Sequence, residues 1–386
     1  MAETESDLAQ IVYELNRSST TAAKAERKSL LDELLRQAVE LGASDILLVA
    51  GSTVTMRVHG ALTSGQGTMG TGRILSGEDV RGLVKPLLTE EQAKELETNR
   101  ALDFCFVRDG MGRFRTNVHY QRGTLAASMR LLPAQIPSVE SLHLPAVVTR
   151  LTERKQGLIL LTGPTGCGKT STMAALIDLI NERRREHIIT IEDPVEYQHA
   201  NRSSIVEQIE VGRDTPTFGH AVRAVLRQNP DVILIGEMRD TETMSAALTA
   251  AETGHLVFSS LHTNDAAQTM SRILDSFPAS NQTQIRQQLS MALLAVIAQQ
   301  LVPAEDGAGR YPAMEVMVGT TAIRNLIRTG QDHQMRSQIS TGSADGMMTM
   351  DQSLAELVRW RRISRETALA HCHHADEMRA LLVRVA

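Results

Sequence analysis

Residues 163–170 read GPTGCGKT, which fits the phosphate-loop (P-loop) pattern GxxxxGK[ST]. The loop stands between an apolar strand expected at Leu158–Thr162 and a helix expected at Lys169–Arg184. Glycines let the backbone curl so that successive N–H groups face phosphate oxygens, and the helix N-terminus adds positive potential. This stretch therefore predicts a nucleotide-binding α/β domain.

The loop and the first helical residues form the predicted phosphate site. Lys169 is expected to reach the β- and γ-phosphates, and the Thr170 hydroxyl is expected to ligate Mg²⁺. Cys167 is interpreted as a small filler, with redox control at a helix N-terminus as the alternative. The predicted nucleotide-binding set is Gly163, Pro164, Thr165, Gly166, Cys167, Gly168, Lys169, Thr170 and Ser171.

Strands and helices alternate regularly around this loop. Further strands are expected at Ile188–Glu192, Val232–Gly236 and Leu256–Ser260, and helices at Thr217–Arg227, Thr241–Thr253 and Ala266–Ser276. Strands joined by helical crossovers favour a mostly parallel sheet covered on both faces. A helix expected at Gln284–Leu301 begins a last hundred residues that look chiefly helical.

Acidic side chains are expected at the carboxyl ends of two of these strands, where open α/β sheets bind their ligands. Glu237 follows the apolar residues of Val232–Gly236 and can hold the Mg²⁺ shell or polarise the attacking water. Glu196 ends a second acidic stretch and can position metal or act as general base. The sequence does not separate the two glutamates as general base.

Two histidines bracket the strand expected at Leu256–Ser260. A neutral imidazole of His255 or His262 could hydrogen-bond a γ-phosphate, and an ordinary structural role is the alternative for each. The tail His371–His374 also carries metal-capable groups, which we interpret as surface residues.

Composition limits the function classes. The 386 residues are 42% hydrophobic and 22% charged, as in a globular protein of two domains. A net charge of −5 argues against nucleic acid as a partner. Met1–Gln10 lacks the pattern of a secretory signal, and no apolar stretch approaches the ~18–20 residues that span a bilayer. These features predict a cytoplasmic protein without a transmembrane segment, and its three scattered cysteines predict reduced thiols.

Five segments follow from these patterns. They are a flexible leader (1–25), a small α+β domain (26–132), a proline-bearing linker (133–146), an ATPase core (147–310) and a mainly helical C-terminal part (311–386).

Four stretches together resemble one family, the secretion-type traffic ATPases, and within it the type IV pilus retraction ATPases. The P-loop, Thr190–Glu196, Asp231–Asp240 and Gly254–Asn264 are similar to its Walker A, Asp box, Walker B and His box. The resemblance runs from about Leu30 to Asp376 and implies a RecA-like core preceded by a PAS-like N-terminal domain. It also implies Glu196 as catalytic glutamate, Glu237 as Walker B glutamate, and His255 and His262 as the His-box pair.

The resemblance extends to arginines outside the core. Residues 112–115 and 129–130 resemble the arginine-bearing strands that the family presents to nucleotide. The resemblance makes Arg113, Arg115 and Arg130 candidate nucleotide ligands. The alternative for each is an ordinary arginine on a solvated strand surface. Residues 322–328 read AIRNLIR, the signature associated with retraction. Gln208–Glu210 departs from the family because the arginine usual in the middle is missing.

The resemblance further implies ATP and Mg²⁺, and a homohexameric ring at the inner-membrane pilus base. Its partners would be a platform protein there and a paralogous retraction ATPase, and its work would be pilus retraction in twitching motility. The alternatives are an assembly-type pilus or type II secretion ATPase, which usually carries a four-cysteine zinc module, and a RecA-like nucleic-acid motor. An accessory subunit that binds nucleotide without hydrolysis is a further alternative.

Overall fold

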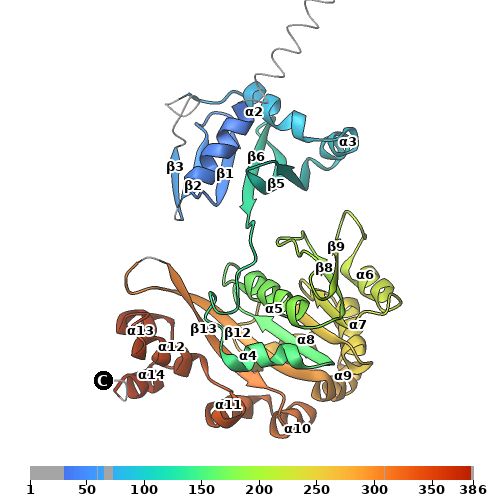
Figure 1. Ribbon diagram of the computed structural model, residues 1–386, viewed down its shortest axis with the longest axis vertical. Coiled ribbons are helices and arrows are strands. Elements are labelled where there is room, and N and C mark those ends of the chain that lie inside the picture. Colours follow the sequence, from blue (N-terminus) through green and yellow to red (C-terminus); the bar gives the residue numbers. More distant parts are fainter. Residues whose placement is uncertain (1–29, 59, 65–72, 308, 384–386) are drawn as a thin grey trace, which may run out of the picture. The chain divides into compact units, whose positions relative to one another are not determined.

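The computed structural model describes residues 30–58, 60–64, 73–307 and 309–383. The chain divides into two compact units, Met1–Ala134 and Gln135–Ala386, and each is described by itself (Figure 1). The leader expected at 1–25 lies outside the described residues.

The first unit is a six-stranded antiparallel sheet with helices packed on it, in the strand order β3-β2-β1-β6-β5-β4. Its core contains fully buried Leu35, Leu48, Met56 and Phe114. Capping boxes at Ser76 and Thr89 start two of the helices. The strands are β1 (Asp45–Val49), β2 (Thr55–Val58), β3 (Ala61–Ser64), β4 (Ala101–Arg108), β5 (Gly112–Gln121) and β6 (Thr124–Leu132), and the helices are residues 30–40, α2 (Gly77–Val84), η1 (Lys85–Leu87) and α3 (Glu90–Asn99).

The second unit is built on a seven-stranded sheet in the order β13-β12-β7-β11-β10-β8-β9. All neighbouring pairs are parallel except β12 with β13. The strands are β7 (Gly157–Thr162), β8 (His187–Glu192), β9 (Ile205–Glu210), β10 (Val232–Ile235), β11 (Leu256–Ser260), β12 (Leu293–Pro303) and β13 (Arg310–Val318).

Helices cover both faces of this sheet. Leu158 and Leu160 of β7 pack in the cluster that contains α6 to α10, whereas Ile159 and Leu161 pack with α4 and α5. The helices are α4 (Ala146–Arg150), η2 (Leu151–Glu153), α5 (Lys169–Arg183), α6 (Phe218–Val225), α7 (Thr241–Glu252), α8 (Ala266–Asp275), α9 (Ala279–Ala292) and α10 (Thr321–Thr329). Burial on both faces explains why β7, β10 and β11 read as continuous apolar runs.

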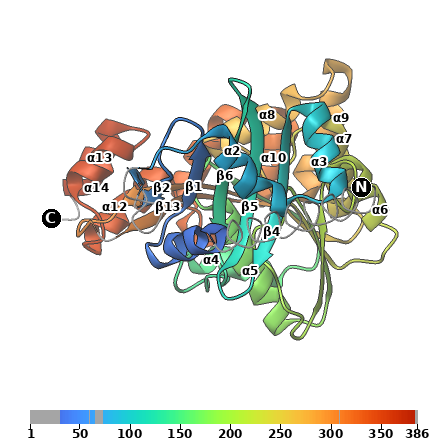
Figure 2. The same cartoon turned by 90° about the horizontal axis from the view of Figure 1, so that it is seen from above.

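The last helices form a separate small cluster against β12 and β13. Met350, Leu354, Ala368, Met378 and Leu382 share one buried core there, and α12, α13 and α14 lie together near the C-terminus in Figures 1 and 2. The helices of this cluster are α12 (Met350–Arg359), α13 (Arg365–His371) and α14 (Ala375–Val383), and the remaining elements before them are η3 (Asp332–Gln334), α11 (Met335–Thr341) and η4 (Ser343–Asp345). Among the described helices none has both the length and the apolarity to cross a lipid bilayer.

The helix predicted at Gln284–Leu301 is wrong in its second half. Helix α9 ends at Ala292, and the apolar residues from Leu293 form the buried strand β12 next to β7. A short apolar run that is buried on both faces has no periodicity to distinguish strand from helix. Strand β13 also lies in the part predicted to be mainly helical, where it pairs with β12 as the sheet edge.

Candidate active site

The P-loop joins the end of β7 to the start of α5 and lies close against β12. Gly163 has φ +138°, and a Cβ atom there would lie 2.2 Å from the backbone oxygen of Gln299. Gly168 has φ +90°, and its Cβ would lie 2.9 Å from the Gln299 side chain. Both positions therefore require glycine because of the backbone conformation and the close approach of β12.

Lys169 and Cys167 pack inside this loop. The Lys169 Nζ donates to the backbone oxygens of Gly163 at 2.7 Å and Pro164 at 3.1 Å, so its charge sits within the loop. The Cys167 side chain is buried, and burial raises the pKa of its thiol despite the nearby Lys169 charge. This environment fits a packing role for Cys167 better than a reactive one.

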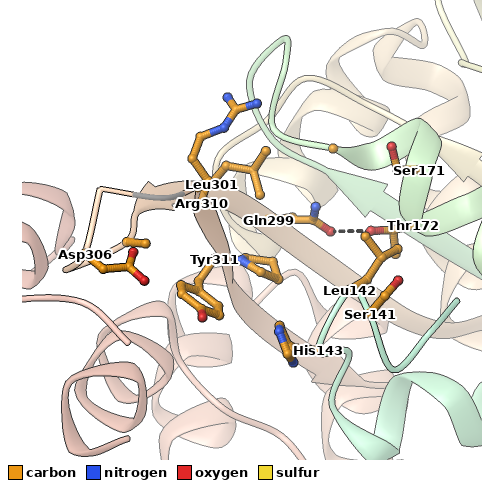
Figure 3. A pocket seen from close by; sticks show the side chains of 14 residues that line it. Ser141, Leu142, His143, Ser171, Thr172, Gln299, Leu301, Asp306, Arg310 and Tyr311 are labelled. Atoms are coloured by element: carbon orange, nitrogen blue, oxygen red, sulfur yellow. Dashed lines mark hydrogen bonds between the residues drawn. The ribbon is translucent and has the colours of Figure 1, made fainter. Parts of the chain in front are cut away.

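Gln299 is a site residue that the sequence analysis missed. It is 3% exposed, donates from Nε2 to the Cys167 carbonyl at 2.6 Å and accepts from the Thr172 hydroxyl at 2.9 Å. Figure 3 shows the second of these bonds. One side chain thus ties the P-loop to the first turns of α5. The available signal was a polar residue after the apolar run at Leu293–Ala298, but the helix predicted there concealed it.

Glu237 and His262 meet at the carboxyl edge of the sheet. Glu237 follows β10, and its carboxylate pairs with the Arg239 guanidinium, which raises the pKa of Arg239. The other carboxylate oxygen, Oε2, lies 3.5 Å from Nε2 of His262, which follows the neighbouring strand β11. The structure therefore brings these two predicted site residues together.

The loop that carries Glu196 is fixed on both sides of that residue. The backbone N–H of Val195 donates to the Glu210 carboxylate at 3.1 Å. The Tyr197 hydroxyl lies 2.8 Å from the Ser171 hydroxyl in α5. Because β8 neighbours β10, Glu196 leaves the sheet at the same edge as Glu237.

Glu192, at the end of β8, is connected to the same loop through Gln208. Its carboxylate accepts from Thr190 at 2.8 Å and from Gln208 Nε2 at 3.2 Å, and the same nitrogen donates to the Tyr197 carbonyl at 2.8 Å. Burial raises the pKa of Glu192. Gln208, one of the residues in the triplet that departs from the family pattern, is thus a structural link here.

His255 lies at the amino ends of the parallel strands, at the opposite end from the P-loop. It precedes β11, whose first residue Leu256 pairs with Gly157 at the start of β7. The His255 Nδ1 lies 3.0 Å from the Ala250 carbonyl oxygen. A five-residue strand spans roughly 16 Å, so the structure does not bring His255 to the P-loop.

A cavity of about 270 Å³ opens beside the P-loop (Figure 3). Gly168, Ser171 and Thr172 line it from the loop and α5, and Gln299 lines it from β12. His143 and Tyr311 come from distant segments, and their rings lie 5.4 Å apart. The cavity could not be predicted from the sequence because its walls lie far apart along the chain.

The family model for "Type II/IV secretion system protein" matches residues 135–382. The chain belongs to this family. The type IV pilus retraction ATPase PilT of Pseudomonas aeruginosa is 43% identical over 342 residues, with 88% of this chain and 96% of that protein covered. A twitching motility protein of Neisseria gonorrhoeae is 42% identical over 334 residues, covering 86% and 87%.

The fold is also similar to that of a solved structure. The crystal structure of the pilus retraction motor PilT with bound ADP superimposes with a TM-score of 0.83 at 45% identity, covering 90% of this chain and 98% of that one. The predicted fold class and family resemblance are confirmed.

The predicted arginines of this secretion-system family member lie in its first unit. Arg115 of β5 stands directly opposite Arg130 of β6, and Arg113 lies two residues before Arg115 on the same face. Asp45 continues the row, with its carboxylate 2.9 Å from the Arg130 Nε and 3.6 Å from the Arg57 Nε. The guanidiniums of Arg115, Arg130 and Arg57 thus follow one row across the sheet, with the Asp45 carboxylate between the last two.

The metal-capable tail of this family member is engaged in ion pairs. His374 Nδ1 lies 3.2 Å from Asp351, and Asp351, His374 and Glu377 lie close enough to share an ion. The Arg336 guanidinium pairs with both carboxylates and supplies the positive charge itself. These contacts give the cluster a structural role.

Proposed function

We propose that this chain hydrolyses ATP with Mg²⁺ in a homohexameric ring and so drives type IV pilus retraction. The observation that carries the proposal is the gathering of Lys169, Glu196, Glu237 and His262 at one edge of a parallel sheet. Relatives named for retraction and twitching motility match over nearly their whole length, and the similar solved motor holds ADP.

The P-loop supplies the phosphate site. Its backbone amides and the Lys169 ammonium bind the phosphate oxygens, and the α5 N-terminus adds positive potential. Thr170 is the second residue of α5 and Glu237 is largely buried at the same edge, so both offer the hard oxygen ligands that Mg²⁺ prefers. The bound ion would neutralise charge on the phosphates.

Glu196 is the better candidate for the general base. The Glu237 carboxylate is already paired with Arg239 and faces His262, which suits a residue that stays ionised and orients its surroundings. Glu196 stands on a loop held to α5 through Tyr197, so its distance from the P-loop helix is fixed. A general base has to lie within hydrogen-bond reach of the attacking water.

The cavity beside the P-loop receives the nucleoside half of ATP. It adjoins Gly168 and Ser171, which places it next to the phosphate site, and its volume suits part of a ligand rather than a whole one. The His143 and Tyr311 rings offer flat surfaces for a base.

The arginine row of the first unit suits a phosphate contact. Arg115 and Arg130 stand opposite each other, and the one Asp45 carboxylate beside Arg130 and Arg57 leaves excess positive charge in the row. An arginine that reaches a transferring phosphoryl group contributes about 10³–10⁵ in rate.

The motor would work in the cytoplasm, peripherally at the inner-membrane pilus base. Its partners there would be a platform protein and a paralogous retraction ATPase. The assembly-type alternative is less well supported, because the three cysteines, Cys105, Cys167 and Cys372, are too few for a four-cysteine zinc module.

The test is Mg²⁺-dependent ATPase activity of the full chain beside Glu196→Gln, Glu237→Gln and the control Glu366→Gln, an exposed carboxylate on α13. We expect turnover by a hexamer, seen by light scattering, that DNA does not stimulate. Each site variant should lower kcat by ~10² or more, since positioned acid–base groups contribute about 10²–10⁴-fold. Turnover equal to wild type in both site variants would exclude this site, and loss of pilus retraction in cells carrying either variant tests the motor role.

A further inference from the structure

Glu315 is a buried carboxylate that joins the starts of two helices. It lies on β13, is 5% exposed, and accepts a hydrogen bond from the backbone N–H of Ala266 at 2.9 Å. The backbone N–H of Met350 also donates to it. Ala266 is the first residue of α8, and Met350 is the first residue of α12. One side chain therefore satisfies helix N-terminal amides that have no partner within their own helices.

The start of α8 is closely attached to the loop that carries His262. Asp265 caps α8, and its side chain accepts from the Gln268 backbone N–H. The Thr269 hydroxyl donates to the Asp265 carbonyl and lies 2.7 Å from the Thr263 hydroxyl. Residues 263–265 are thus fixed to the first turn of α8. A shift of this turn would move His262 with it.

The charge of Glu315 is balanced between opposing effects. Burial raises its pKa to about 7, and the neighbouring Asp265 carboxylate also raises it. The two helix amides and the Arg336 guanidinium of α11 lower it, and Arg336 lies 3.5 Å from Asp351 of α12. The ionised carboxylate can accept from both amides, whereas the protonated group turns one oxygen into a donor that faces an N–H.

We propose that Glu315 is a positioning residue that holds His262 beside Glu237 and links this loop to α12. The inference rests on the proposed role of Glu237 and His262 in ATP hydrolysis. Because Glu315 lies on β13 and outside the P-loop contacts, its loss should affect kcat rather than nucleotide binding. The same carboxylate should pass a displacement of the His262 loop on to the C-terminal helices.

The first experiment compares kcat and KM of the full chain from pH 5.5 to 8.5 with Glu315→Gln, Glu315→Ala and the control Glu366→Gln. A misplacement of 1 Å can cost about 10²-fold in rate. We expect Glu315→Ala to lower kcat about tenfold with KM within about twofold, since the loop shifts but remains tethered. Wild-type kcat should rise as pH passes 7, where Glu315 ionises, and Glu315→Gln should lose this step. Wild-type kcat and pH profile in both Glu315 variants would overturn the proposal.

A second measurement does not depend on turnover. Amide hydrogen exchange, followed by mass spectrometry, should become faster at residues 261–266 and 349–351 in Glu315→Gln, with the P-loop unchanged. Unchanged exchange at both helix starts would overturn the link even if Glu315→Ala failed to fold. Absence of turnover in the wild type would instead reject the proposed function, while exchange still tests Glu315.

Discussion

Gln299 shapes the P-loop although it lies well over a hundred residues away in sequence. Its buried amide bonds both the Cys167 carbonyl and the Thr172 hydroxyl. A Gln299→Leu change keeps the volume and leaves both partners unpaired, at roughly 1–3 kcal/mol for each buried group. Part of this cost falls on the loop geometry that binds phosphate. We expect ADP affinity to weaken about tenfold by isothermal titration, which corresponds to about 1.4 kcal/mol.

The neighbouring Gln300 provides a matched control. Its Nε2 donates to the His371 carbonyl in the C-terminal helices and has no bond to the P-loop among the described contacts. Gln300→Leu should leave ADP affinity within about twofold of wild type. Equal losses in the two variants would mean that Gln299 acts only through general stability.

At the scale of elements, α10 contains two arginines with different surroundings. Arg324 donates to the backbone oxygens of Gly319 at 2.8 Å and Met291 at 3.1 Å, so it fastens α10 to the end of α9. Arg328 is exposed and bonds only Asn325 of its own helix among the described contacts. The AIRNLIR sequence therefore combines a structural arginine with one that a partner can reach.

This difference predicts opposite results for two alanine variants. Arg324→Ala removes charge-assisted hydrogen bonds, whose net contribution is at most about 1.5–3 kcal/mol each for this partly exposed side chain. We expect a fall in Tm of roughly 4 °C by scanning calorimetry. Arg328→Ala should leave Tm and ATPase activity unchanged and reduce pilus retraction in cells. A stable Arg324→Ala protein beside an unfolded Arg328→Ala protein would contradict the assignment.

The elements also show what sequence can predict. Strands β7 and β10 were predictable because glycine-rich or acidic residues mark where each apolar run stops. The strand β12 was not, because the apolar run from Leu293 follows a true helix without a glycine or proline between them. That error also concealed Gln299. Its role depends on β12 lying next to β7, which is a fact of topology rather than of local pattern.

At the scale of the whole molecule, the residues proposed to act on ATP fall in two units. The P-loop and the acidic edge belong to Gln135–Ala386, which has its own core, whereas Arg115 and Arg130 belong to Met1–Ala134. A fragment of residues 135–386 should fold and bind ADP. Its ATP turnover should fall by about 10³-fold or more, the smaller value for a lost arginine contact.

Full-length Arg115→Ala is the companion measurement, because it removes one guanidinium and keeps the remaining chain. It should reproduce most of the loss in turnover while ADP titration stays near wild type. Full turnover by the fragment would show that the first unit contributes nothing to the chemistry. The motif residues of the P-loop were predictable from the sequence, whereas the parallel pairing of β11 with β7 shows which of the two bracketing histidines lies at the P-loop end.

The buried thiol of Cys167 has a consequence for how the motor tolerates oxidative stress. Peroxides and alkylating reagents attack thiolates that solvent can reach. Cys167 offers neither condition, because it is 3% exposed and its pKa is raised. The Cys167 thiol of the P-loop is therefore poorly reactive. We expect the phosphate site to keep its function when the protein is exposed to oxidants.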